Sequence, residues 1–275
     1  MIGVFDSGFG GLSVFRELIY AFPKHDFIYL GDNARYPYGD RSADTVFRFT
    51  REAVSWLFKE GCELVILACN TASAQALRRI QQEWLPPQSS EKRVLGVLVP
   101  VVEDVAGGIE AHDRVGVIAT RGTIRSNAYL RELTKHLPTD SDIIQQSCPL
   151  FVPLVEEGWL DHPVTKAVAY YYLAPLAKQG VNKLILGCTH YPFLVPVIAD
   201  VMGESCQLFD PGPIVAKRLA SYLKKHKDLD AKIRITGLRR YVTTDDPVRF
   251  NEFAQKAAGL SVDAQRLLLA EFDRI

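Results

Sequence analysis

The stretch Leu64-Val65-Ile66-Leu67-Ala68-Cys69-Asn70-Thr71 decides the fold class. Its four leading apolar residues predict a short buried strand, and Asn70 and Thr71 belong to the residue types that cap helices. The second half of the chain repeats the pattern in Leu184-Ile185-Leu186-Gly187-Cys188-Thr189-His190. Strands that lead directly into helices are typical of βαβ units and a parallel sheet. The sequence therefore predicts an α/β fold with a cysteine at the carboxyl end of one strand in each half.

Apolar runs and helical spacing continue this alternation along the chain. Strands are predicted at residues 2–5, 27–30, 64–67, 94–98, 115–118, 142–146 and 183–186. Helices are predicted at residues 13–20, 43–59, 72–84, 121–136, 164–178 and 192–202. The two halves also open alike, with Ile2-Gly3-Val4-Phe5-Asp6-Ser7-Gly8 and Gly116-Val117-Ile118-Ala119-Thr120-Arg121-Gly122. This repetition predicts two similar α/β lobes with mostly parallel sheets.

The lobes are expected to divide the chain unevenly. Residues 1–97 plus 208–275 are assigned to the lobe that carries Cys69, and residues 98–207 to the lobe that carries Cys188. In open α/β sheets, ligands bind outside the carboxyl ends of the strands. Lobes that face each other would therefore place both cysteines across one cleft.

Composition limits the classes of partner. The 275 residues include 32 Lys plus Arg and 32 Asp plus Glu, and this balance argues against nucleic acid or an anionic membrane surface. No apolar run reaches the length of a membrane span, and the first residues lack the features of a signal peptide. The five cysteines show no C-x₂-C spacing of a metal or redox site. We expect a cytoplasmic protein with cysteines present as thiols.

The settings of Cys69 and Cys188 favour reactive thiols. A helix N-terminus stabilises a thiolate, which predicts a lowered pKa for both cysteines, and His190 is a proton partner for Cys188. The alternative for either cysteine is an inert thiol packed as a small hydrophobe, and we adopt it for Cys62, Cys148 and Cys206. Two matched thiols suit proton transfer at opposite faces of one carbon, as racemisation requires. A single nucleophilic cysteine with a histidine would instead indicate acyl transfer.

Several motifs resemble those of the glutamate racemase family and occur in the family's order over residues 1 to about 212. The motifs are Asp6-Ser7-Gly8-Phe9-Gly10-Gly11-Leu12-Ser13, Gly31-Asp32-Asn33-Ala34-Arg35-Tyr36-Pro37-Tyr38-Gly39, Ala68-Cys69-Asn70-Thr71-Ala72, Val99-Pro100-Val101-Val102-Glu103, Thr120-Arg121-Gly122-Thr123, Cys148-Pro149-Leu150-Phe151-Val152-Pro153-Leu154-Val155-Glu156 and Gly187-Cys188-Thr189-His190-Tyr191-Pro192. No catalytic position departs from the family pattern.

This resemblance implies a cofactor-independent racemase that interconverts L- and D-glutamate and supplies D-glutamate for peptidoglycan. It implies that Cys69 removes the α-proton of D-glutamate and Cys188 that of L-glutamate, without pyridoxal phosphate or metal. Asp6, His190, Asp32 and Glu156 are implied as assisting catalytic groups. The implied substrate-binding residues are Asp6, Ser7, Pro37, Tyr38, Gly39, Asn70, Thr71, Thr120, Thr123, Thr189 and His190.

The chemistry explains why such a site needs many donors. The α-hydrogen of an amino acid is a very weak acid, and without a cofactor the protein must stabilise the developing charge with fixed donors. Helix N-termini after Cys69 and Cys188 supply backbone N–H groups, and the turn at Tyr38-Gly39 offers donors to a distal carboxylate. The assisting residues also have structural interpretations: Asp6 and Ser7 as caps, residues 36–39 as an ordinary turn, His190 as a packed side chain and Glu156 as a solvated charge.

Three rival functions are considered. Aspartate and hydantoin racemases share paired cysteines and two lobes, but they typically carry Glu at the position of His190, which favours glutamate. A non-catalytic glutamate-binding module would have no need of two activated thiols. An interaction protein, as in family members implicated in gyrase inhibition, has no support in the neutral charge. The oligomeric state is open, with a homodimer as the family's frequent form.

Overall fold

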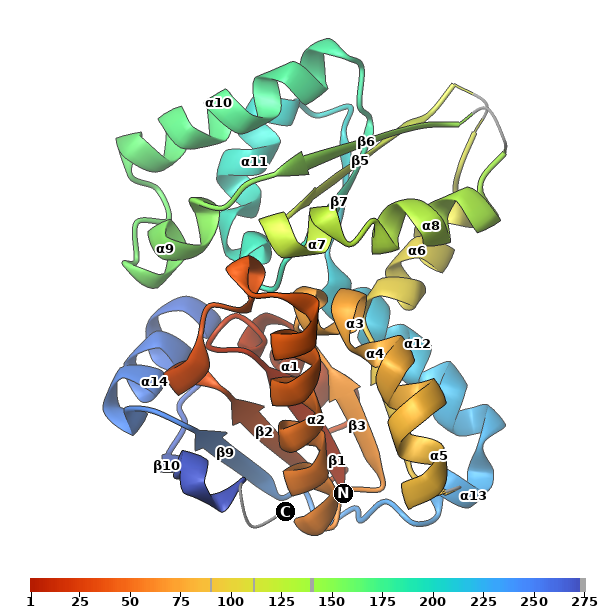
Figure 1. Ribbon diagram of the computed structural model, residues 1–275. Coiled ribbons are helices and arrows are strands. Elements are labelled where there is room, and N and C mark those ends of the chain that lie inside the picture. The colour runs from red at the N-terminus through yellow and green to blue at the C-terminus, as the bar shows by residue number, and fades with distance from the viewer. Residues whose placement is uncertain (90, 111, 139–140, 273–275) are drawn as a thin grey trace.

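The computed structural model describes residues 1–89, 91–110, 112–138 and 141–272, which fold into two α/β lobes (Figure 1). The larger sheet has the strand order β10-β9-β2-β1-β3-β4, and the smaller sheet has the order β6-β5-β7-β8. Every strand pair in both sheets is parallel. The predicted fold class is therefore confirmed. The strands of the larger sheet are β1 (Ile2–Asp6), β2 (Phe27–Gly31), β3 (Leu64–Leu67), β4 (Arg93–Gly96), β9 (Arg239–Thr243) and β10 (Ala264–Arg266), and those of the smaller sheet are β5 (Arg114–Ala119), β6 (Asp142–Ser147), β7 (Lys183–Gly187) and β8 (Gln207–Phe209).

The pattern that repeats in the sequence corresponds to a strand order that repeats in the structure. The order β2-β1-β3-β4 in the larger sheet corresponds to β6-β5-β7-β8 in the smaller one, so each lobe contains the same four-strand unit. In both units the strand that leads to a cysteine pairs with the opening strand: β3 with β1, and β7 with β5. Strands β9 and β10 extend only the larger sheet.

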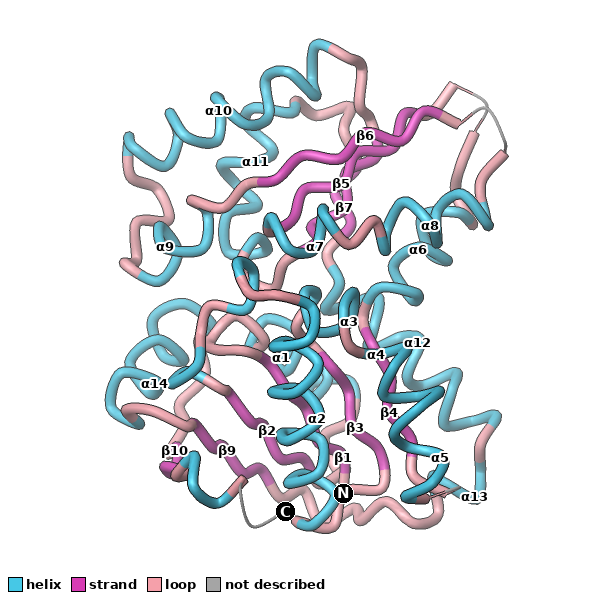
Figure 2. Tube along the Cα trace, viewed as in Figure 1, coloured by secondary structure: helices cyan, strands magenta, loops and turns pink. Residues whose placement is uncertain are grey.

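Helices cover both faces of the sheets (Figure 2). The α-helices are α1 (Leu12–Ala21), α2 (Ala43–Lys59), α3 (Asn70–Gln75), α4 (Leu77–Arg79), α5 (Leu85–Gln88), α6 (Leu98–Ala106), α7 (Arg121–Arg125), α8 (Ala128–His136), α9 (Phe151–Glu156), α10 (Pro163–Lys178), α11 (Val195–Met202), α12 (Pro211–Lys225), α13 (Lys227–Asp230) and α14 (Pro247–Phe253). No helix in the described ranges is both long enough and apolar enough to cross a membrane.

Four predicted elements differ from the structure. The helix predicted at 192–202 begins as a 3₁₀ turn at Tyr191–Leu194, and α11 follows from Val195. The strand predicted at 94–98 ends at Gly96, and Leu98 already begins α6. The helix predicted at 72–84 is divided into α3, α4 and a π-helical turn at Ile80–Trp84. The helix predicted at 121–136 is interrupted at Asn127, whose φ of 52° is left-handed and cannot continue a helix.

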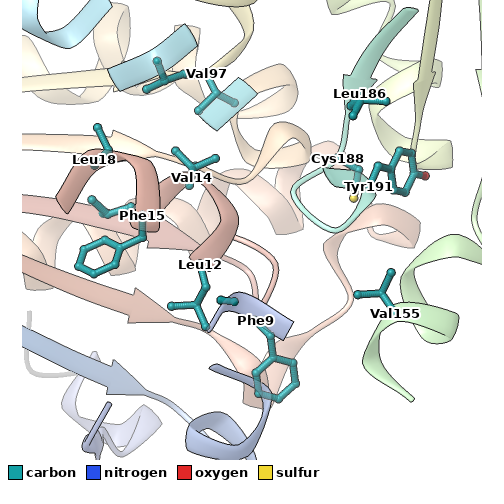
Figure 3. Close-up of a cluster of buried hydrophobic side chains, with 14 of the residues drawn as sticks. Phe9, Leu12, Val14, Phe15, Leu18, Val97, Val155, Leu186, Cys188 and Tyr191 are labelled. Carbon is teal, nitrogen blue, oxygen red and sulfur yellow. The ribbon is translucent and has the colours of Figure 1, made fainter. Parts of the chain in front are cut away.

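Apolar side chains on alternate sides of the strands build the core. In β1, Ile2 and Val4 pack in one cluster with residues of α1 and α12, whereas Phe5 packs in another with residues of α2. A parallel sheet buried on both faces needs such side chains at successive positions. The first cluster is continuous from one lobe to the other, and Figure 3 shows Phe9 and Leu12 of the larger lobe with Val155, Leu186 and Tyr191 of the smaller one. This shared core fixes the lobes against each other.

Candidate active site

A cavity of about 370 Å³ lies where the carboxyl ends of the strands of both lobes meet. Both Cys69 and Cys188 line it, although they are far apart in sequence. The other predicted site residues that line the cavity are Ser7, Pro37, Tyr38, Gly39, Asn70, Thr71, Thr120, Thr189 and His190. Asp6, Asp32, Thr123 and Glu156 are not among its lining residues and instead contact residues that are.

Cys69 lies between β3 and α3, and its thiol is protonated at neutral pH. Its Sγ accepts a hydrogen bond from the backbone N–H of Ala72 at 3.4 Å and lies 3.5 Å from Ser7 Oγ. Burial and the nearby carboxyl of Asp6 nevertheless raise the pKa of the Cys69 thiol to about 12. The predicted lowering of this pKa is therefore wrong for the substrate-free protein, because desolvation outweighs the helix N-terminus.

Asp6 joins the two lobes beneath the cavity. It is fully buried at the end of β1, where its Oδ1 accepts the backbone N–H of Gly8 at 2.9 Å. Its Oδ2 accepts the hydroxyl of Thr189, which belongs to the smaller lobe, at 3.2 Å. Burial raises the pKa of the Asp6 carboxyl, while the charge of His190 and these hydrogen bonds oppose the rise. Asp6 therefore fixes the glycine-rich loop rather than capping α1, whose N-cap is Gly11 without a side-chain hydrogen bond, and its charge acts on Cys69.

Cys188, His190 and Glu156 form a chain of contacts within the smaller lobe. Cys188 Sγ lies 3.9 Å from His190 Nδ1, and His190 Nε2 lies 2.9 Å from Glu156 Oε1. Burial lowers the pKa of His190, but its hydrogen bonds to Cys188 and Glu156 and their negative charges outweigh burial and raise that pKa to about 10. The imidazole is therefore an imidazolium at neutral pH. The interpretation of Glu156 as a solvated charge is wrong, because its side chain is only 8% exposed.

Polar side chains from both lobes meet on the wall next to Cys69. Thr71 Oγ1 lies 3.0 Å from Thr120 Oγ1 and 3.1 Å from Thr123 Oγ1, which places Thr123 behind the lining residues. Asn70 accepts the hydroxyl of Tyr129 at 2.7 Å through its Oδ1, whereas its buried Nδ2 has no protein partner among the described residues. A buried donor without a partner is costly, so Asn70 is suited to an anionic ligand.

The segment 36–40 also lines the cavity and is held by Asp32. The hydroxyl of Tyr38 donates to Asp32 Oδ2, and Asp32 also accepts hydrogen bonds from Arg35 at 2.7 Å and Thr244 at 2.9 Å. Burial raises the pKa of Asp32, against the opposing effects of Arg35, Tyr38 and Thr244. Asp32 is therefore linked to the cavity through Tyr38. At Gly39, a Cβ atom would lie 2.9 Å from Thr120 Cβ, so the two lobes touch tightly here.

The sequence interpretation did not identify every lining residue. Tyr36, Asp40, Arg121, Pro149, Leu150, Val152 and Pro153 also line the cavity. Arg121 Nη1 lies 3.6 Å from Asp40 Oδ1, which joins the lobes at the cavity wall. Most of these residues occur in the motifs quoted above, but no residue type among them indicates which side chains face inward.

The described residues contain no group of three or more His, Cys, Asp or Glu that could hold a metal ion. All five cysteines are free thiols. Cys62 and Cys148 are buried and do not line the cavity, and burial raises the pKa of both thiols. The protein groups available for chemistry in the cavity are therefore the thiols of Cys69 and Cys188 and the side chains that contact them.

Comparisons with known proteins agree with this geometry. Residues 2–219 match the family model of Asp/Glu/hydantoin racemases. The glutamate racemase of Geobacter metallireducens is 42% identical over 258 residues, which cover 94% of this chain and 92% of that protein. A crystal structure of a glutamate racemase isoform from Bacillus anthracis aligns with a TM-score of 0.88 at 33% identity, over 98% of this chain and 97% of that one. The glutamate racemase of Francisella tularensis, solved in complex with D-glutamate, aligns with a TM-score of 0.87 at 33% identity over 98% of both chains. The chain therefore belongs to the glutamate racemase family.

Proposed function

We propose that the protein interconverts L- and D-glutamate by a two-base mechanism in which Cys69 and Cys188 exchange the roles of acid and base. The observation that carries the proposal is the position of the two thiols: each follows the corresponding strand of its lobe, and both line one cavity. A substrate held between them would present opposite faces of its α-carbon to the two sulfur atoms. The D-glutamate so formed would serve peptidoglycan synthesis.

The surroundings of the two thiols differ. Cys69 lies beside the carboxyl of Asp6 and holds its proton, because burial and Asp6 raise its pKa to about 12. Cys188 Sγ instead lies 3.9 Å from His190 Nδ1, so a cationic ring is available to stabilise negative charge on this sulfur when it removes a proton. The two sides of the cavity therefore place opposite charges next to their sulfur atoms.

Glutamate is the substrate that the polar wall suits. The unpartnered amide of Asn70 and the hydroxyls of Thr71 and Thr120 can donate to carboxylate oxygens, and the segment Tyr38–Gly39 lies within reach of a distal carboxylate. A site built to pair a distal carboxylate discriminates against a shorter side chain by leaving these donors unpaired. Aspartate should therefore have a much lower kcat/KM than glutamate.

Deuterium incorporation tests the proposed function. The purified protein, treated with EDTA and hydroxylamine and dialysed, is incubated in D₂O with L- or D-glutamate while optical rotation and loss of the α-proton signal are followed. We expect both enantiomers to approach a racemic mixture with α-deuterium in the product. Activity that disappears after the treatment and returns only with pyridoxal phosphate or metal would contradict the proposal, as would a higher kcat/KM for aspartate.

Two further expectations belong to the same proposal. The free thiols of the active site suit a reducing, cytoplasmic location. We also propose that residues 1–97 plus 208–275 form one lobe and residues 98–207 the other. The boundary at 207/208 falls within β8 (Gln207–Phe209), and this strand belongs to the smaller sheet.

A further inference from the structure

Glu156 is contacted on both of its carboxylate oxygens. Oε1 lies 2.9 Å from His190 Nε2 within the smaller lobe. Oε2 lies 3.9 Å from Arg249 Nη2, which belongs to α14 of the larger lobe. Helices α9 and α14 lie on the same side of the molecule, one in each lobe (Figure 1). The carboxylate that orients His190 is therefore itself faced by a cation from the opposite lobe.

Arg249 lies outside the substrate cavity. It lines a separate cavity of about 510 Å³, together with Phe9, Phe253 and Lys256. Its guanidinium lies 5.4 Å from the centre of the Phe9 ring, and Phe9 stacks on Phe253 at 5.0 Å. This aromatic surface supports the guanidinium on the side away from water. Arg249 can reach Glu156 but does not line the cavity that contains the two cysteines.

We propose that Arg249 is a positioning residue that acts on Cys188 through Glu156 and His190. The inference rests on the proposed function, because it assigns a role in the Cys188 half of the proton transfer. Nothing in the described contacts of Cys69 involves Arg249: that thiol is surrounded by Ser7, Ala72 and Asp6.

Charge and geometry together explain the proposed effect. Glu156 is largely buried, and the guanidinium of Arg249 faces its Oε2 while His190 Nε2 contacts its Oε1. Attraction at Oε2 favours one orientation of the carboxylate, which keeps His190 Nδ1 directed at Cys188 Sγ. Loss of Arg249 leaves Oε2 without its cation and loosens the imidazolium. The proton transfer at Cys188 should slow in both reaction directions, and that at Cys69 should not.

Isotope effects separate the two transfers. With α-deuterated L-glutamate the labelled hydrogen moves to Cys188, and with α-deuterated D-glutamate it moves to Cys69. In Arg249→Ala we expect kcat to fall about three- to tenfold, as for loss of a partly exposed ion pair. The deuterium isotope effect on kcat/KM should rise with L-glutamate and fall toward one with D-glutamate, because the unlabelled transfer at Cys188 then limits the rate. Arg249→Lys, which keeps the charge, should restore most of the wild-type pattern.

Lys256→Ala is the matched control, because Lys256 lines the same cavity and pairs with Glu252 at 3.5 Å rather than with Glu156. It should leave both isotope effects unchanged. If Arg249→Ala lowers thermal stability, Arg249→Gln, which keeps the aliphatic stem over Phe9, provides the same comparison. The inference would be overturned if Arg249→Ala and Arg249→Gln both kept the wild-type isotope effects. It would also be overturned if the isotope effects shifted equally for the two enantiomers. Failure of the proposed function is distinguishable, because the wild-type protein itself would then lose glutamate racemisation after the EDTA and hydroxylamine treatment or would prefer aspartate.

Discussion

At the scale of single residues, the two cysteines share a position in the fold but differ in their surroundings. Cys69 is buried beside the carboxyl of Asp6, whereas Cys188 is buried beside the imidazolium of His190. The same strand-to-helix position therefore leaves one thiol protonated and supplies the other with a positive charge. The matched motifs indicated a pair of cavity cysteines, and His190 follows Cys188 by two residues, so a histidine partner for Cys188 was predictable. The pKa of Cys69 was not predictable, because it depends on burial and on Asp6, which is distant in the chain.

The raised pKa of Cys69 predicts how this thiol reacts. In Cys188→Ser, alkylation of Cys69 by iodoacetamide should be slow at pH 7.5 and should rise about tenfold per pH unit up to pH 9.5, because the pKa of about 12 lies above that range. Peptide mass spectrometry measures the rate at this cysteine alone. Asp6→Asn removes the carboxylate that raises this pKa and should speed alkylation at each pH. A rate that levels off near pH 8.5, the value of an ordinary cysteine, would contradict the assignment.

At the scale of elements, Asp32 fixes the short helical segment that carries Tyr38 and Gly39. Its buried carboxylate accepts hydrogen bonds from Tyr38, Arg35 and Thr244. Asp32→Ala removes these hydrogen bonds and leaves the positive charge of Arg35 only partly compensated. We expect the free energy of unfolding in urea to fall by about 3 kcal/mol, and KM for glutamate to rise more than kcat falls. Asp44→Ala, which removes an exposed pair with Arg79, should change neither. A large loss of kcat without loss of stability would instead make Asp32 an acid or base.

The predictability of the elements follows from what stabilises each of them. The strands β1, β2, β3, β5, β6 and β7 agree with the prediction to within one residue at each end. The apolar runs of five of them are buried on pairing, whereas β6 is only partly buried. Strands β8, β9 and β10 were not predicted: β9 begins with Arg239 and Arg240, and β8 and β10 are three-residue edge strands. Their pairing depends on an existing sheet edge, which local sequence does not encode.

At the scale of the whole molecule, the site depends on close contact between lobes. Gly10 of the larger lobe packs directly on His190 and Thr189 of the smaller one, and a Cβ atom there would overlap both side chains. We expect Gly10→Ala to fold but to lower kcat/KM by at least about tenfold, because the lobes must separate and misplace the two thiols. Gly108→Ala, where an added Cβ meets no atom within 4 Å, is the control. Equal activity of the two variants would show that lobe contact at Gly10 is unimportant.

The residues of the site could be predicted from the sequence only where they lie in recognisable motifs. The residues that follow β1, β3 and β7 could be assigned from their position at strand ends, and the structure brings them to one cavity. The contact of Arg121 with Asp40 and that of Arg249 with Glu156 join residues of different lobes. No local pattern indicates such pairs, because they depend on how the lobes pack.

The central claim, that each thiol serves one face of the substrate, is tested most directly by a one-sided reaction. Elimination of HCl from β-chloroglutamate requires removal of the α-proton only. Both Cys69→Ser and Cys188→Ser should lose racemisation, because serine is a far poorer base at neutral pH. Cys69→Ser should retain elimination from the enantiomer with the L configuration at the α-carbon, and Cys188→Ser from the one with the D configuration. If one variant retained full racemisation while the other eliminated HCl from neither enantiomer, a single cysteine would serve both faces and the two-base account would be wrong.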